Sequence, residues 1–366
     1  MLKKLLLLAI LFLSFQSFSQ IPSGYYNSAT GSGYTLKTQL KSIIKNGHID
    51  KGYGALYNAY IKTDNDAFYE NDNTVLDMYS EKPSSSDPYN YNHNTRKCGN
   101  YNSENDCYNR EHIFPQGFFN SKYPMRSDIH HVVPSDGYVN GKRSNFPFGE
   151  VNSATWTSSN GSKLGSNTTE GYTNTVFEPL DEFKGDIARM LFYFATRYED
   201  DVTSSTWDAH TVANNPLNGT NNQVYEDWYI KLLYKWHTDD PVNQREITRN
   251  NEAYIFQGNR NPFIDHPEYV NNIWGSVLSV KSFSFNKKNI SVYPNPSSIR
   301  RITITFSTKE TIDNVSLYSI LGKIVYHQKK PKLTNSKLKI KNLKPGIYLL
   351  KVTSDFKNVT KKVIIK

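Results

Sequence analysis

The side chains that could carry out chemistry are concentrated in one stretch of the chain, residues 108–151. Two histidine-containing blocks, NREHIFP at 109–115 and DIHHVVP at 128–134, precede the segment DGYVNGKRSN at 136–145. Together they offer imidazoles, carboxylate and amide oxygens, and guanidinium groups. Hydrolysis of a phosphodiester needs a base for water, ligands for a cation, and donors for the developing negative charge. A hard cation such as Mg²⁺ keeps several waters, so one carboxylate and one amide oxygen would be enough protein ligands.

Composition and spacing alone leave ordinary structural roles open for these side chains. Glu111 could form an ion pair with Arg110 or Arg126. Asn140 is followed by Gly141, and the pair Asn-Gly favours turns. A lone histidine in a small domain is also more often structural than catalytic. From the residues themselves, metal-assisted hydrolysis is therefore one reading among several.

The order of these motifs resembles the signature of the bacterial endonuclease I family. Further along the chain, FEP at 177–179, EFKGD at 182–186 and GNRNPFIDHP at 258–267 also resemble that family. The likeness covers about residues 57–274 and rests on several ordered motifs. It implies a secreted or periplasmic nuclease that cuts DNA, RNA or both with little sequence specificity, built around a ββα-metal core.

The resemblance implies a role for three residues by motif. His112 would be the general base that activates water, while Glu111 and Asn140 would hold a Mg²⁺ ion, which Mn²⁺ or Ca²⁺ could replace. His112 would end a strand, and Asn140 would come from the helix of the ββα unit. Imidazole suits the base because its ordinary pKa of about 6.5 leaves it mostly neutral at working pH. Asn can bind a cation through its carboxamide oxygen without adding negative charge near phosphate.

Two assignments stay open. His131 competes with His112 for the role of base, since each is followed by two apolar residues and a proline. The family also uses an arginine near the scissile phosphate, and the motif does not identify it. Arg126 and Arg143 are the candidates, with Arg110 behind them.

Hydrophobic periodicity predicts the elements that must position these residues. Helices are predicted at 34–44, 54–61, 183–197, 225–236 and 242–257, a strand at 71–79, a loop at 83–108, and an exposed hairpin or insertion at 152–174. After residue 290, short β-rich runs alternate with turn residues and contain no helical run, which is typical of a small β-sandwich. The predicted fold class is α+β: a mixed nuclease domain with a ββα-metal core, followed by an all-β sandwich.

The chain is long enough for two domains. Residues 1–19 have a basic start, an apolar run and small residues before Gln20, which predicts a secretory signal peptide. We assign 20–278 to the catalytic domain, 279–289 to a linker and 290–366 to the β-sandwich. The apolar run is too short for a membrane-spanning helix, so no integral membrane segment is expected after signal cleavage.

The C-terminal region has a resemblance of its own. YPNP at 293–296, LKPGIY at 343–348 and KKVIIK at 361–366 are similar to the C-terminal sorting domain of type IX secretion. That likeness implies export across the inner and outer membranes and makes the type IX secretion machinery a partner. The protein would then be secreted or held at the cell surface. The ordinary alternative is a β-sandwich that binds carbohydrate or protein.

The formal net charge of +9 does not by itself indicate binding to nucleic acid. From residue 276 onward there are 19 Lys and Arg against 3 Asp and Glu, a net charge of +16. The residues before 276 contain 24 basic and 31 acidic side chains, a net charge of −7. If the N-terminal region binds a polyanion, it must therefore do so through a local basic patch and a metal.

The two cysteines, Cys98 and Cys107, lie close together in a polar, Asn-rich stretch. In an oxidising compartment they are expected to form one small disulfide. A metal site made of these thiols is the weaker alternative, because no other cysteine could complete a tetrahedral set.

We therefore predict a secreted, Mg²⁺-dependent, monomeric endonuclease whose substrate is DNA, RNA or both. The alternative is a surface binding or adhesion module with an inactive nuclease-like segment. That alternative is disfavoured because Glu111, His112 and Asn140 are all present, whereas an inactive relative should have lost at least one of them.

Overall fold

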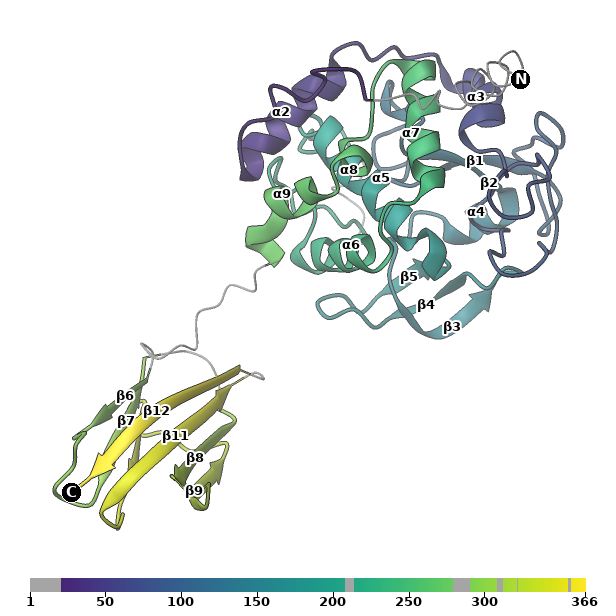
Figure 1. Ribbon diagram of the computed structural model, residues 1–366. Helices are drawn as coiled ribbons and strands as arrows, with labels where there is room; N and C mark the ends of the chain where they lie inside the picture. Colours follow the sequence, from purple (N-terminus) through teal and green to yellow (C-terminus); the bar gives the residue numbers. More distant parts are fainter. Residues whose placement is uncertain (1–20, 208–213, 279–289, 308–311, 321, 355–356) are drawn as a thin grey trace, which may run out of the picture. The chain divides into compact units, whose positions relative to one another are not determined.

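The computed structural model describes residues 21–366 except 208–213, 279–289, 308–311, 321 and 355–356. The chain forms two compact units, one ending at Leu278 and the other beginning at Ser279 (Figure 1). The predicted signal peptide and linker lie outside the described residues. Within the described part of the chain, no helix has the length and apolarity needed to cross a membrane.

A strand–strand–helix unit carries most of the predicted site. Strand β1 (Tyr108–His112) pairs antiparallel with β2 (Val132–Asp136), and helix α4 (Gly137–Arg143) follows β2 directly. Asp136 caps α4, because its side chain accepts a hydrogen bond of 2.9 Å from the Val139 backbone N–H. This ββα arrangement is the one that the family resemblance predicted.

Most of the helices lie to one side of this strand–strand–helix unit (Figure 1), and every residue of helix α5 among them is buried. The longer helices are α2 (Gly33–Lys45), α3 (Leu56–Thr63), α5 (Lys184–Arg197), α6 (Asp227–Asp239), α7 (Gln244–Gln257) and α9 (Glu268–Leu278). The short ones are η1 (Tyr53–Ala55), η2 (Met125–Ser127), η3 (Asp181–Phe183) and α8 (Pro262–Asp265). Gly258 ends α7 with a φ of 84°, a conformation that glycine adopts without strain. All five predicted helices are confirmed.

A second sheet has the order β3-β4-β5, formed by Val151–Thr157, Lys163–Asn167 and Thr175–Glu178. The expected hairpin at 152–174 is therefore confirmed, and most residues of β3 are exposed.

The predicted strand at 71–79 is wrong. Only an isolated bridge joins Val75 to Asn65, and Asp77 starts a turn in which its carboxylate accepts the Tyr79 N–H at 2.9 Å. An Asp side chain that bonds its own following backbone competes with a sheet ladder. The pattern of apolar residues there reflects burial of a loop, because residues 75–81 are all buried.

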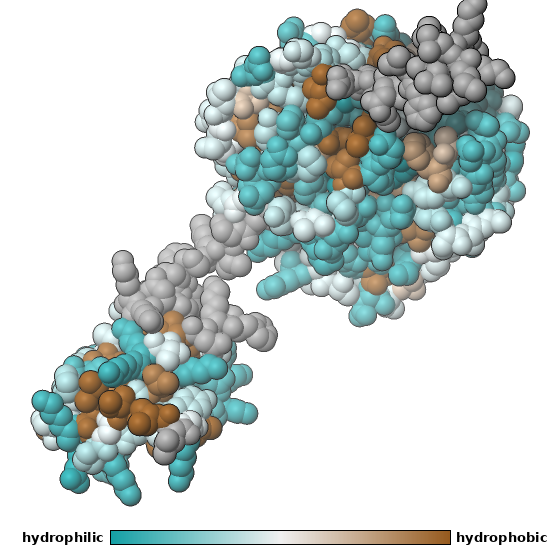
Figure 2. All heavy atoms as spheres, in the orientation of Figure 1, coloured by the Kyte–Doolittle hydropathy of each residue, from teal (hydrophilic) through white to brown (hydrophobic). Residues whose placement is uncertain are grey.

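The second unit is all β, as predicted. Its strands are β6 (Ile290–Tyr293), β7 (Ile302–Phe306), β8 (Asn314–Ser319), β9 (Ile324–Lys329), β10 (Lys337–Ile340), β11 (Gly346–Ser354) and β12 (Lys357–Ile365). They form two sheets, β10-β7-β6 and β12-β11-β8-β9, around one apolar core. Along β11, exposed Ile347 and Leu349 alternate with buried Tyr348 and Leu350. Figure 2 shows apolar side chains gathered on this unit's surface.

The expected disulfide is present. Cys98 and Cys107 are joined with their Cα atoms 5.8 Å apart, and Cys107 immediately precedes β1. The backbone oxygen of Cys107 accepts a hydrogen bond of 2.9 Å from the Gly137 N–H at the start of α4. The disulfide therefore closes the loop of residues 98–107 beside the ββα unit.

Reduction of the disulfide should lower the melting temperature of the first unit by several degrees. Closing a loop of about ten residues is worth roughly 2.7 kcal/mol in the chain-entropy model. The measurement is thermal unfolding by circular dichroism with and without dithiothreitol. A Cys98→Ser/Cys107→Ser variant serves as the control and should melt at the lower temperature in both buffers. Equal melting of the native chain in both buffers would contradict the prediction.

Candidate active site

Three residues that the motif singled out, Glu111, His112 and Asn140, line a single cavity of about 300 Å³. Glu111 and His112 come from the end of β1, and Asn140 comes from the middle of α4. The other residues that line the cavity are Tyr101, Arg110, Pro115, Gln116, Gly141, Arg143, Ser144 and Asn145. The antiparallel β1–β2 pair followed directly by α4 is what brings the strand and helix residues together.

His112 is held in one tautomer. Its Nε2 lies 3.0 Å from the Arg126 backbone oxygen, which can only accept, so Nε2 carries the proton. The lone pair therefore resides on Nδ1, the nitrogen left to act as a base. Burial, followed by the neighbouring charge of His131, holds the pKa of His112 well below its usual range. The ring is neutral at pH 7 and ready to accept a proton.

Glu111 is a buried carboxylate with two donors on one oxygen. The Tyr79 hydroxyl donates to Oε1 at 3.0 Å, and Nη1 of Arg143 lies 3.2 Å from the same atom. Burial raises the pKa of the Glu111 carboxyl to about 7, although Arg143 opposes that rise. The ion-pair partner is thus Arg143, neither of the two arginines expected from the sequence.

Asn140 is oriented by Asn109. Its Nδ2 donates a 2.7 Å hydrogen bond to Oδ1 of Asn109, so the carboxamide oxygen of Asn140 remains as the free acceptor. Tyr91 donates to the capping carboxylate of Asp136 at 2.6 Å, which fixes the start of the helix that carries Asn140. Asn140 is therefore a helical residue and does not form the turn that Asn-Gly would favour.

The donor set in this cavity suits a hard divalent cation. A carboxylate and a carboxamide oxygen are the ligands that Mg²⁺, Mn²⁺ and Ca²⁺ prefer, and no thiol lines the cavity. Burial raises the pKa of the Glu111 carboxyl, so a cation bound beside it would stabilise its ionised form. The residues therefore fit the metal that the family resemblance implied.

His131 lies outside the cavity. Its Nε2 is 2.8 Å from the Met125 backbone oxygen, and its ring packs edge-on against Phe194 with centroids 4.9 Å apart. The side chain is fully buried, and its Nδ1 is without a hydrogen-bond partner. Its ring lies 6.0 Å from that of His112. The structure thus separates two histidines that the local sequence made equivalent.

The three candidate arginines occupy different environments. Arg143 is buried and donates to the backbone oxygens of His112 at 2.9 Å and Ile113 at 2.7 Å, in addition to its contact with Glu111. Arg110 lines the cavity and is half-buried. Arg126 is half-buried, and it lies outside the residues that line the cavity.

Tyr53 holds both half-buried arginines. The Arg110 guanidinium carbon lies 3.4 Å from the centre of the Tyr53 ring, and that of Arg126 lies 4.5 Å from it. Arg110 also donates to the Tyr53 backbone oxygen at 2.8 Å. Two cations thus sit near His112 without a carboxylate to neutralise either of them among the ion pairs of the described residues.

Sequence reasoning missed two tyrosines at this site. Tyr79 carries no signal, because only tertiary contact brings it to Glu111 from 32 positions earlier in the chain. Tyr101, inside the disulfide loop 98–107, lies against α4 and lines the cavity. A Cβ at Gly141 would stand 2.5 Å from its hydroxyl oxygen, so the close approach requires glycine there. The two glycines of the GYVNG segment, Gly137 and Gly141, were the sequence signal that could have indicated this close approach.

A row of partly exposed aromatic rings leads away from the cavity. Tyr138 lies 6.4 Å from Tyr101 and 6.2 Å from Trp156 between ring centroids. The Lys142 ammonium stands 5.0 Å from the Tyr138 ring. Phe118 and Phe119, by contrast, are buried in the core and offer no surface for stacking bases.

Comparison with known proteins finds relatives for both units of the chain. The Endonuclease I family model matches residues 32–268, and that of the secretion system C-terminal sorting domain matches residues 291–366. An extracellular ribonuclease of Bacillus amyloliquefaciens is 36% identical over 254 residues, which cover 68% of this chain and 78% of that protein. An extracellular ribonuclease of Bacillus subtilis is 35% identical over 255 residues, with the same coverage of 68% and 78%. An Endonuclease-1 of Buchnera aphidicola is 25% identical over 141 residues, 38% of this chain and 45% of that protein.

Replacing Arg143 with Met should destabilise the first unit strongly. The change leaves the Glu111 carboxylate buried without its cation and two backbone oxygens without their donor. Removing one partner of a buried pair costs about 3–5 kcal/mol. The measurement is urea unfolding in EDTA at pH 8, above the pKa of about 7 that the Glu111 carboxyl has beside Arg143. Arg110→Met is the matched control and should cost much less, because its side chain is half-buried. Equal unfolding midpoints for the two variants would refute this role of Arg143.

Proposed function

Because the chain belongs to the endonuclease I family and carries a C-terminal sorting domain, it is a secreted or cell-surface endonuclease, and we propose that its activity depends on Mg²⁺ or a similar cation. The observation that carries the proposal is the convergence of Glu111, His112 and Asn140 on one cavity. Glu111 and Asn140 would hold the ion through their side-chain oxygens. When bound, such a cation supplies charge stabilisation at the phosphate oxygens.

The chain's own residues have distinct tasks in this proposal. Nδ1 of His112 removes a proton from the attacking water, while the Arg126 backbone oxygen keeps the ring in the required tautomer. Arg110 contacts the scissile phosphate, because it lines the cavity and is only half-buried. Arg143 and Tyr79 position Glu111, and Asn109 positions Asn140.

The substrate we propose is RNA, DNA or both, cut with little sequence specificity. Two relatives that are named extracellular ribonucleases favour RNA among the substrates. Contacts to phosphate carry no sequence information, so an arginine and a cation at the phosphate do not select a base. The aromatic row of Tyr101, Tyr138 and Trp156 beside Lys142 offers stacking surfaces for unpaired bases, which are likewise tolerant of sequence.

The proposal also covers the export of the chain and its oligomeric state. The C-terminal unit would be recognised by the type IX secretion machinery, and its charge of +16 after residue 276 contrasts with the acidic catalytic unit. The secreted enzyme would act as a monomer, as expected from the sequence.

Substitution of His112, with His131 for comparison, tests the proposed base. The secreted form of the chain should cut plasmid DNA or RNA with Mg²⁺ and should fail with EDTA. His112→Ala should lower kcat by about 10²–10⁴-fold, the usual contribution of a general base. His131→Ala should keep most of the activity at a temperature where it is folded, although its melting temperature should fall. Circular dichroism of both variants provides the control for folding.

The possible results separate the competing explanations. If His131→Ala is the inactive, folded variant, the base must be reassigned. If the folded wild-type chain cuts neither polymer with any divalent cation, the binding or adhesion module becomes the better explanation.

Arg110→Ala should lower kcat/KM by about 10²–10³-fold, as expected when one donor to a developing charge is removed. Its melting temperature should change little. Arg126→Ala is the matched comparison, because it removes a similar guanidinium that stacks on the same tyrosine. Initial rates on a defined oligonucleotide give the result. Full activity in Arg110→Ala together with a large loss in Arg126→Ala would move the phosphate contact to Arg126.

A further inference from the structure

A second group of carboxylates lies outside the proposed active site. One carboxylate oxygen from each of Asp66, Glu70 and Glu81 lies within 4.8 Å of the others. All three belong to the loop between α3 and the disulfide loop. Residues 64–90 contain seven Asp and Glu against a single basic residue, Lys82. None of the ion pairs among the described residues involves a member of this trio.

Glu81 is the observation that calls for a ligand. Its side chain is 1% exposed, and its Oε1 has no hydrogen-bond partner. Leaving a buried charged group unpaired is costly, so such groups are normally paired or bound to a metal. The backbone of Glu81 is firmly held, because its N–H donates to the Asp77 backbone oxygen at 2.9 Å and its carbonyl accepts from Asn160 at 3.2 Å. The carboxylate is therefore fixed beside two others without a cation to balance it.

The pKa values of two carboxyl groups in this loop also show that negative charge is unfavourable there. Burial, and then the neighbouring charges of Asp87, Glu70 and Asp66, raise the pKa of Glu81 to about 9. Burial also raises the pKa of Asp87 to about 6. These groups repel one another in the absence of a positive charge.

We propose that Asp66, Glu70 and Glu81 form a structural Ca²⁺ site, separate from the catalytic cavity and independent of the proposed function. The ligand oxygens are close enough for one ion, since Ca²⁺–oxygen distances are about 2.4 Å. Ca²⁺ takes several carboxylates from flexible loops, whereas Mg²⁺ usually binds one or two and keeps its waters. Exposed Glu70 leaves the site open to solvent on one side, while Asp66 and Glu81 are buried.

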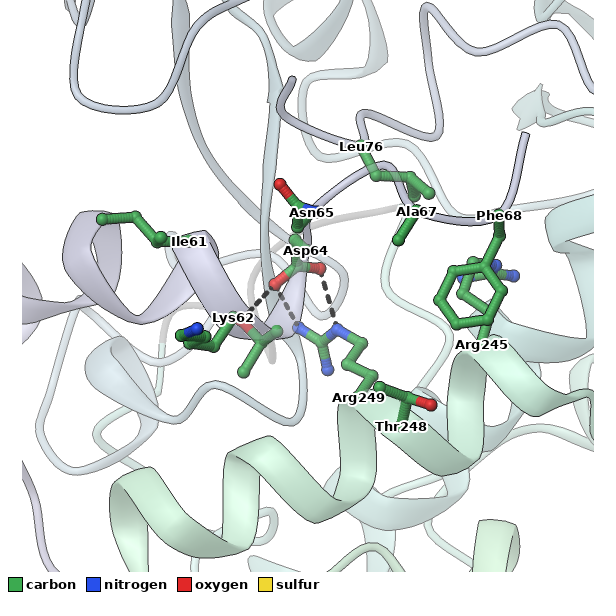
Figure 3. A pocket seen from close by; sticks show the side chains of 11 residues that line it. Ile61, Lys62, Asp64, Asn65, Ala67, Phe68, Leu76, Arg245, Thr248 and Arg249 are labelled. Carbon is green, nitrogen blue, oxygen red and sulfur yellow. Dashed lines mark hydrogen bonds and ion pairs between the residues drawn. The ribbon is translucent and has the colours of Figure 1, made fainter. Parts of the chain in front are cut away.

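The rest of the loop is anchored by other contacts. Asp64 pairs with Arg249 of α7 at 2.8 Å, beside a separate cavity of about 140 Å³ (Figure 3). The Leu76 N–H donates to the Asp64 backbone oxygen at 2.9 Å, and the Asp66 N–H to that of Thr74. No member of the carboxylate trio lines that cavity. The ion pair thus fixes where the loop begins and leaves the trio's own charge unbalanced.

The site would support the active site through the segment 77–81. Asp77 accepts the Asp136 N–H at 2.8 Å, and Tyr79 donates to Glu111 at 3.0 Å. Glu81 lies two residues after Tyr79. A cation that draws Glu81 toward Asp66 therefore holds the chain that positions both the N-cap of α4 and the Glu111 carboxylate.

Calcium binding can be tested in the secreted full chain with Glu111→Gln as the background, so that the proposed catalytic site contributes no carboxylate. We expect one Ca²⁺ bound by isothermal titration calorimetry. The melting temperature should rise by about 2–4 °C at ten times the dissociation constant. Adding Glu81→Gln should abolish both effects. In EDTA this variant should melt no lower than its background, because it replaces a buried carboxyl group whose Oε1 has no hydrogen-bond partner with a neutral amide.

Two further variants make the result specific. Glu70→Gln changes an exposed ligand and should weaken Ca²⁺ binding without affecting folding. Glu170→Gln makes the same change at an exposed residue outside the trio and should bind Ca²⁺ normally. The proposal would be overturned if both Glu81→Gln and Glu70→Gln still gave a Ca²⁺-binding heat and a Ca²⁺-dependent rise in melting temperature. It would also be overturned if the background protein showed neither effect. Nuclease activity is not part of this test, so its result is independent of the proposed function.

Discussion

Burial of the Glu111 carboxylate is the constraint on which the catalytic unit depends. A carboxylate removed from water must be compensated, and here Arg143 and Tyr79 share that task on one oxygen. Glu111 comes from β1, Arg143 from the end of α4, and Tyr79 from a distant loop. One charged group therefore joins a strand, a helix and a loop, and Arg143 strengthens the junction by donating to the backbone at His112 and Ile113.

The neighbouring histidines show how tertiary surroundings divide chemically identical groups. Both His112 and His131 donate Nε2–H to a backbone oxygen, and burial lowers the pKa of each. They differ in where their side chains lie. His112 lines a cavity together with Glu111 and Asn140, the proposed metal ligands, whereas His131 packs against Phe194 in the core. A place in the lining of the cavity, more than basicity, distinguishes the proposed base from its structural neighbour.

The loops around the ββα unit do more than connect its elements, because they also form and support the cavity. The disulfide loop presses Tyr101 onto α4 at a position where only glycine fits, and so forms a wall of the cavity. The acidic loop, residues 64–90, supplies Asp77 and Tyr79, which fix the cap of α4 and the Glu111 carboxylate. A covalent bond holds the first loop. The second has no comparable crosslink near its carboxylates, which is why a bound cation there would have structural value.

Local sequence determined much of this protein. Helical periodicity and turn residues predicted the helices and the all-β tail, and two cysteines in a secreted chain predicted the disulfide. The family resemblance of the ordered motifs implied the ββα segment that contains Glu111, His112 and Asn140. It misplaced the segment around Asp77, because the apolar residues of a buried loop imitate a strand. Tertiary structure alone decided which arginine pairs with Glu111, which histidine reaches the cavity, and that Tyr79 takes part. Those outcomes depend on distances between segments far apart in the chain, and spacing along the sequence does not encode such distances.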